Sequence, residues 1–168
     1  ILRAKALGYQ VLVTDHHLPG EHLPAADVIL NPNQSGDGFA SKALAGVGVI
    51  FYLLLAVRKR MRELDIAHAD ADLSSLLDLV AIGTVADMVR LDANNRRLIR
   101  AGLSRIRKGQ CQAGVEALAQ VSGLELSRLS ETVIGYRKTT KIYAAGRLED
   151  TSLGIECLLT DSITAGLD

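Results

Sequence analysis

The sequence is poor in several residue types. Its 168 residues include no tryptophan, two phenylalanines, four tyrosines, three prolines and two cysteines. Cys111 and Cys157 match neither a disulfide framework nor a CxxC metal pattern, so a reduced, cytoplasmic setting is expected. The longest apolar stretch, residues 47–57, is too short to span a bilayer. The 19 basic side chains balance 19 acidic ones, which excludes nucleic-acid binding through overall charge but allows a local basic groove.

Short apolar strands alternate with helical patterns in the first third of the chain. A helix over residues 2–8 closes on Gly8 as a C-cap, and strands are predicted at 11–14 and 28–30. A strand that follows a helix in this way is typical of a parallel sheet. A long helix is predicted from an N-cap at Ser41 to about residue 64.

The rest of the chain is predicted to be mainly helical. Helices are expected at about 73–82, with Gly83 as the breaker, at 94–107 with a basic face, at 112–121, and from about residue 150. The chain opens on Ile1 and stops at Asp168 inside a helical pattern. We therefore expect an internal fragment of a longer protein.

The first strand leads directly into Asp15, His16 and His17. Open α/β sheets place their chemistry at the carboxyl ends of strands, and imidazole with carboxylate suits divalent transition metals. Adjacent residues of an extended chain point in opposite directions, so one histidine would bind metal while the other faces substrate or supports the site. Spacing alone leaves a functional and a structural role for the pair equally open.

A second segment with an acid at its end, Gly83-Thr84-Val85-Ala86-Asp87, lies 71 positions after His16. Taken alone, Asp87 is better explained as a cap for the next turn. The arginine-rich helix that follows is most simply a solvent-exposed face, and contact with phosphates is the alternative.

Several blocks carry a family resemblance. Residues 13–20 look like the signature of the DHH phosphoesterase superfamily, and further blocks resemble its RecJ-like branch, at residues 31–33, 41–48, 77–87, 91–96 and 144–148. The blocks run in family order over nearly the whole chain. One departure is the stretch 136–143, where the family's Gly-Pro-Arg-x-Asn pattern is replaced, and another is Arg90, where proline is common.

The resemblance implies a fold and an activity. The fold is a three-layer α/β domain with a parallel sheet and helices on both faces, truncated at its first strands. Residues 1–110 would be the C-terminal part of the DHH catalytic domain. Residues 111–168 would be a helical continuation, cut before any later domain. The activity is a 5′→3′ exonuclease on single-stranded DNA in repair and recombination, with Mn²⁺ or Mg²⁺ as cofactor.

The resemblance also implies roles for individual residues. His16 and Asp87 would bind the metal, and Asp15 and His17 would be catalytic residues that support the site and face the scissile phosphate. A divalent ion polarises a phosphoryl oxygen and lowers the pKa of a bound water.

DNA-binding residues are implied as well. Arg147, with Gly146, would bind the terminal 5′ phosphate, because a guanidinium matches phosphate with its forked donors. Ser41, Lys42 and Arg96 complete the expected DNA-binding set. The expected partner is single-stranded DNA with a 5′ end. Single-strand-binding protein and a helicase are candidate protein partners. The protein is expected to be a monomer that does not associate with a membrane.

Two alternatives remain open. One is a DHH-type phosphoesterase acting on short oligonucleotides, cyclic dinucleotides or pyrophosphate, which a comparison of long strands with dinucleotides would separate from an exonuclease. The other is a non-catalytic replication scaffold. The retained residues Asp15, His16, His17 and Asp87 count against a scaffold.

The isolated 168-residue chain is expected to be inactive or nearly so. The resemblance places further metal-binding aspartates upstream of the signature. His16 and Asp87 alone are too few protein ligands to bind a divalent ion tightly. Metal-dependent cleavage of 5′-phosphorylated single strands by the purified chain would contradict this expectation.

Overall fold

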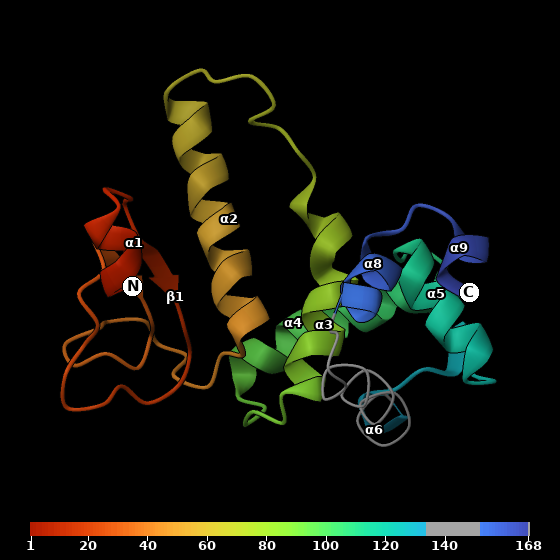
Figure 1. Ribbon diagram of the computed structural model, residues 1–168. Helices are drawn as coiled ribbons and strands as arrows, with labels where there is room; N and C mark the ends of the chain where they lie inside the picture. The colour runs from red at the N-terminus through yellow and green to blue at the C-terminus, as the bar shows by residue number, and fades with distance from the viewer. Residues whose placement is uncertain (134–151, 168) are drawn as a thin grey trace.

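The chain folds as a mixed α/β structure with a small parallel sheet and mostly helices (Figure 1). The computed structural model describes residues 1–133 and 152–167. The strands β1 (Leu12–Thr14) and β2 (Val28–Leu30) pair in parallel, with Val13 opposite Ile29. The helical elements of the described residues are α1 (Leu2–Ala6), α2 (Gly46–Glu63), the 3-10 turn η1 (Leu73–Leu76), α3 (Leu77–Ala86), α4 (Ala93–Arg107), α5 (Ala113–Val121), the 3-10 turn η2 (Leu126–Arg128), α6 (Glu131–Val133), α8 (Ser152–Leu159) and α9 (Ile163–Leu167).

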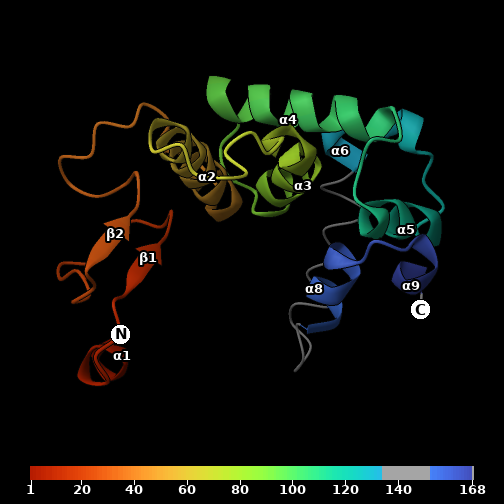
Figure 2. The same ribbon diagram turned by 90° about the horizontal axis from the view of Figure 1, so that it is seen from above.

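The α2 helix stands between the strand pair and α3, and α4 passes α3 on its way to α5 (Figures 1 and 2). A helix that precedes β1 ends as predicted, because Gly8 adopts φ +82° and its N–H donates to the carbonyl of Lys5 at 2.9 Å. Both strands lie where the sequence places them, so the predicted parallel pairing next to Asp15, His16 and His17 is confirmed.

The N-cap predicted for α2 is wrong. The helix begins at Gly46 with Ala45 as its N-cap, and no side chain caps it. Ser41 lies five residues earlier, and its hydroxyl donates to the Asp92 carboxylate at 2.7 Å. A long-range partner therefore takes the hydroxyl that the local pattern assigned to the helix start.

Gly83 does not break α3, contrary to the sequence prediction. The helix continues through it to Ala86, because Gly83 is the point where α3 approaches α2. A Cβ atom at Gly83 would lie 2.8 Å from Cγ1 of Val47, closer than two carbons can pack. The missing side chain lets the two helices lie against each other at this point.

The α3 helix is the central element of the core. Ile82 packs into one buried cluster, with Ile99, Leu103, Ile106, Val115 and Leu129. Val80 packs into a second, with Leu44, Val49, Phe51 and Leu98. Burial on both sides explains why α3 is mostly apolar, with Asp78 and Thr84 as its buried polar residues. None of the described helices combines the length and apolar character that crossing a bilayer requires.

Replacing Gly102 by alanine is expected to destabilise the protein. Helix propensity alone would favour alanine by about 1 kcal/mol. The new Cβ, however, would lie 2.1 Å from the Leu77 carbonyl oxygen and 2.5 Å from Cβ of Ala81, and overpacking of this kind costs about 1–3 kcal/mol. Urea unfolding should show a net loss in Gly102→Ala, whereas Ser104→Ala, at an exposed position of α4, should change stability by less than about 0.5 kcal/mol. Greater stability of Gly102→Ala would contradict this packing.

Candidate active site

The carboxyl ends of β1 and β2 meet at one edge because the two strands are parallel. The strand β1 leads into Asp15, whose N–H donates to the carbonyl of Leu30 at 3.0 Å and so extends the pairing by one residue. The strand β2 leads into Asn31 and Asn33. Two polar turns are thereby placed side by side, as the sequence predicts for the end of a parallel sheet.

Asp15 organises the histidine turn. Its Oδ1 accepts the backbone N–H of His16 at 2.7 Å and that of His17 at 3.2 Å, and it lies 2.7 Å from Nδ1 of His17. Partial burial raises the pKa of the Asp15 carboxyl. The hydrogen bonds from the His17 ring and from the two N–H groups outweigh this effect and hold the pKa below its usual value. Asp15 is therefore an ionised, turn-forming carboxylate near neutral pH.

The structure brings His16 and Asp87 together although they are 71 positions apart in the sequence. Nε2 of His16 lies 3.2 Å from Oδ2 of Asp87. Asp87 is the C-cap residue of α3, and the His16 ring lies beside the first turn of α2, where a Cβ on Gly46 would be 3.6 Å from the ring carbon Cδ2. Their side chains are 15% and 31% exposed, so both remain accessible to a small ion.

The donor pair suits a divalent metal ion. Two neighbouring ligands around an octahedral ion with bonds of about 2.1 Å lie about 3 Å apart, close to the 3.2 Å between these atoms. Imidazole nitrogen with carboxylate oxygen is a donor set that Mn²⁺ accepts. Among the described residues, no group of three or more His, Cys, Asp or Glu side chains is placed to hold a metal ion. The remaining ligands of an ion here would be water, substrate or residues outside the described part.

Two asparagines that the site prediction omits hold the histidine turn from the other strand end. Nδ2 of Asn33 donates to the carbonyl of His16 at 2.7 Å, and Nδ2 of Asn31 donates to the carbonyl of His17 at 2.8 Å. Their position in the sequence could have pointed to this role, since Asn31-Pro32-Asn33 directly follows β2.

Ser41 and Lys42 make contacts of another kind. Ser41 is 4% exposed and bonds to Asp92. The Lys42 ammonium donates to the carbonyls of Pro32 and Asp37 at 2.6 and 2.7 Å and lies 3.1 Å from the Asp37 carboxylate. Within the described part of the chain, neither side chain hydrogen-bonds to His16 or Asp87. Both brace the segments around the site.

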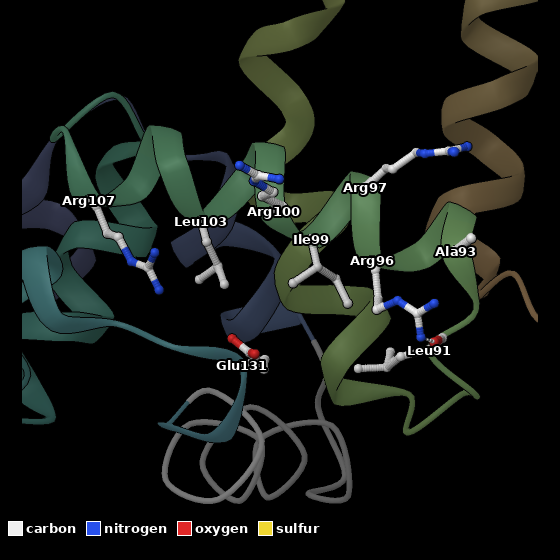
Figure 3. A pocket seen from close by; sticks show the side chains of 9 residues that line it. All are labelled: Leu91, Ala93, Arg96, Arg97, Ile99, Arg100, Leu103, Arg107 and Glu131. Carbon is white, nitrogen blue, oxygen red and sulfur yellow. Dashed lines mark hydrogen bonds between the residues drawn. The ribbon is translucent and has the colours of Figure 1, made fainter.

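Arg96 lies along a groove on α4 (Figure 3). Its Nη1 donates to the carbonyl of Leu91 at 2.8 Å. The groove has a volume of about 650 Å³, and arginines supply most of its charge, namely Arg96, Arg97, Arg100 and Arg107, with Glu131 as the acidic residue. Figure 3 shows Arg96 and Arg107 on the same side of α4 as Ile99 and Leu103, with Arg97 directed away. Gly146 and Arg147 lie outside the described residues.

A protein-family model described as the DHH family, N-terminal domain, matches residues 1–84. The chain belongs to the DHH family.

Relatives of this DHH chain are RecJ exonucleases. It is 53% identical over 160 residues to the single-stranded-DNA-specific exonuclease RecJ of Dickeya dadantii, a match that covers 93% of this chain and 28% of that protein. The crystal structure of RecJ from Thermus thermophilus in complex with Mn²⁺ matches 99% of this chain and 24% of that one, with a TM-score of 0.80 and 31% identity. The Mg²⁺ complex of RecJ from the same organism matches 95% of this chain and 22% of that one, with a TM-score of 0.74 and 30% identity.

These matches confirm the resemblance to the RecJ-like branch. The chain spans about 28% of the length of the Dickeya relative. The DHH family model ends at residue 84, three positions before Asp87. The fold therefore joins a histidine inside the matched segment to an acid just beyond it.

Asp92 connects the loop after Asp87 to the segment before α2. It caps α4 by accepting the Asn95 N–H at 2.9 Å, and it accepts the Ser41 hydroxyl. Partial burial raises the pKa of its carboxyl. The bonds from Asn95 and Ser41, with a further N–H from Asn94 and the charge of Arg90, outweigh this and hold the pKa below its usual value.

The Asp92 contacts predict a loss of stability in acid. Because the folded-state pKa is depressed, the carboxylate contributes stability above its unfolded-state pKa of about 3.9, and that contribution disappears as the pH falls through the folded-state value. Urea unfolding at a series of pH values should show a shallower acid-induced fall for Asp92→Asn than for the unmodified protein. Asp70→Asn, at a side chain 92% exposed, serves as the control. Identical slopes for Asp92→Asn and the unmodified protein would contradict the assignment.

Proposed function

We propose that this chain is part of a metal-dependent exonuclease that hydrolyses single-stranded DNA in the 5′→3′ direction. The contact between His16 and Asp87, at 3.2 Å, is the observation that carries the proposal. The contact joins a family signature to a distant acid and leaves both side chains accessible. The RecJ relatives are named for single-stranded-DNA-specific exonuclease activity, which supports the choice of substrate.

In this proposal His16 and Asp87 hold Mn²⁺ or Mg²⁺, the ions present in the matched RecJ structures. When bound, such an ion would polarise a phosphoryl oxygen of the substrate. Asp15 has a different task. It closes the turn that carries both histidines, and its carboxylate fixes the His17 ring through Nδ1.

His17 is proposed to face the scissile phosphate. Its side chain is 74% exposed, and the contact of Nδ1 with Asp15 directs Nε2 as the nitrogen for substrate. With Nδ1 engaged by the Asp15 carboxylate, Nε2 is the ring nitrogen proposed to contact a phosphate oxygen of the substrate.

The strand is proposed to be bound by basic side chains on one side of the site. Arg96 in the α4 groove would contact phosphates, and Arg147, with Gly146, would receive the terminal 5′ phosphate. Ser41 and Lys42 are proposed to act near the DNA through the segments they brace. Single-strand-binding protein and a helicase are proposed partners of the whole protein.

The proposed architecture completes the observed one. Residues 1–110 would belong to a three-layer DHH domain whose remaining strands and metal-binding aspartates lie upstream, and residues 111–168 would continue its helical part. The whole protein is proposed to act in the cytoplasm as a monomer.

Removing either metal ligand is the test of this function. In the full-length protein, His16→Ala and Asp87→Asn should each lower Mn²⁺-dependent degradation of a 5′-phosphorylated single strand by more than about 100-fold, because loss of a ligand exceeds the effect of losing an outer-shell partner. Asp70→Asn, at a distant exposed acid, should leave the rate unchanged.

The substrate series separates the proposal from its alternatives. Products released from the 5′ end of long strands, with little turnover of dinucleotides, would support an exonuclease. Faster hydrolysis of dinucleotides or pyrophosphate would identify a small-substrate phosphoesterase. Full activity in both ligand variants would overturn the metal site.

A further inference from the structure

The carbonyls of His16 and His17 lie just beyond the strand ladder. The pairing of β1 with β2 ends at Thr14 and Leu30, with one more bond at Asp15. Past that point the two histidine carbonyls have no strand partner in the described sheet. Side chains from the end of β2 take over, since Asn33 donates to His16 at 2.7 Å and Asn31 donates to His17 at 2.8 Å.

The Asn31 side chain is itself held by the backbone of Asn33. Oδ1 of Asn31 accepts the backbone N–H of Asn33 at 2.9 Å, so the amide nitrogen of Asn31 must be the atom that faces the His17 carbonyl. Asn31 is 3% exposed, and in such a site a lost hydrogen bond is not readily replaced by water. The turn after β2 thereby becomes a rigid template for the turn after β1.

The template is itself held from outside. Pro32, between the two asparagines, has a fixed φ, and its carbonyl accepts the Lys42 ammonium at 2.6 Å. Gln34 anchors the next position, because its Nε2 donates to the carbonyl of Ile29 at 2.9 Å. The fixed Pro32 backbone and the Lys42 contact set where the Asn33 amide lies, whereas the Gln34 contact ties the following residue back to β2.

We propose that Asn33 is a positioning residue that orients His16 for metal binding, with Asn31 doing the same for His17. This inference rests on the proposed metal site. The position of a histidine Nε2 follows from where its backbone lies, and a ligand displaced by a fraction of an ångström binds metal less well. A hydrogen bond to the His16 carbonyl fixes that backbone without contacting the metal.

The experiment compares Asn33→Ala with Gln34→Ala in the full-length protein. Both substitutions remove a side-chain amide from the half-buried turn after β2, and each of these amides donates to a backbone carbonyl. Only Asn33 donates to the metal-ligand residue, because the carbonyls that Gln34 contacts belong to Ile29 and Asn31. Free Mn²⁺ measured by electron paramagnetic resonance gives the affinity without any assay of activity, and thermal unfolding gives the structural cost of each change.

Asn33→Ala is expected to weaken Mn²⁺ binding about 10-fold, at the lower end for the loss of a partner that orients a ligand. Gln34→Ala should bind Mn²⁺ as the unmodified protein does. Its shift in melting temperature should be comparable to that of Asn33→Ala. In the nuclease assay, Asn33→Ala should need more Mn²⁺ for half-maximal rate and approach the unmodified rate at saturation.

Each outcome has a separate meaning. Equal Mn²⁺ affinity in Asn33→Ala and the unmodified protein, with His16→Ala clearly weakened, would overturn the positioning role and leave the metal site standing. Equally weakened Mn²⁺ binding in Asn33→Ala and Gln34→Ala would show that any loosening of the turn lowers the affinity, and this would overturn the inference. If His16→Ala binds Mn²⁺ normally, the proposed metal site itself fails, whatever Asn33→Ala does.

Discussion

The close approach of α2 to its two neighbours is the constraint on which the site depends. Gly46, the first residue of α2, lies beside the His16 ring, and the next residue, Val47, packs against Gly83 of α3. One turn of helix thus contacts both the segment that carries the histidines and the helix that ends at Asp87. A side chain at Gly83 would push α3 away from α2 and so move the two donor atoms apart.

Rigidity of the loops follows from polar side chains more than from apolar packing. The strand pair has three residues on each side, too few to hold its own turns. Amides from Asn31 and Asn33 and the Lys42 ammonium supply the missing bonds. Asp92 does the same between α4 and the segment before α2. Each bond is modest, about 1 kcal/mol, but together they leave the histidine turn few alternative positions.

Local signals in the sequence predicted the fold correctly wherever the residues concerned make their contacts with near neighbours in the sequence. Gly8 ends α1, and the strand at 28–30 is reproduced, because their chemistry is satisfied within a few residues. The predictions at Ser41 and Gly83 were wrong because the contacts of these two residues lie far away in the sequence. A hydroxyl that resembles an N-cap bonds to Asp92, 51 positions away, and a glycine that resembles a helix breaker is where two helices touch. Tertiary contacts override propensity at such positions.

The pairing of His16 with Asp87 came from the family resemblance, since spacing alone left the role of the histidines open and favoured a capping role for Asp87. The supporting asparagines were not predicted, because a side-chain amide that reaches a backbone carbonyl has no periodic pattern. The measurement that tests the central claim most directly is the nitrogen hyperfine coupling of bound Mn²⁺ in the full-length protein. A histidine ¹⁴N coupling that is present in the unmodified protein and in Gln34→Ala, and absent in His16→Ala, is the expected result. A coupling that persists unchanged in His16→Ala would show that the ion is bound elsewhere.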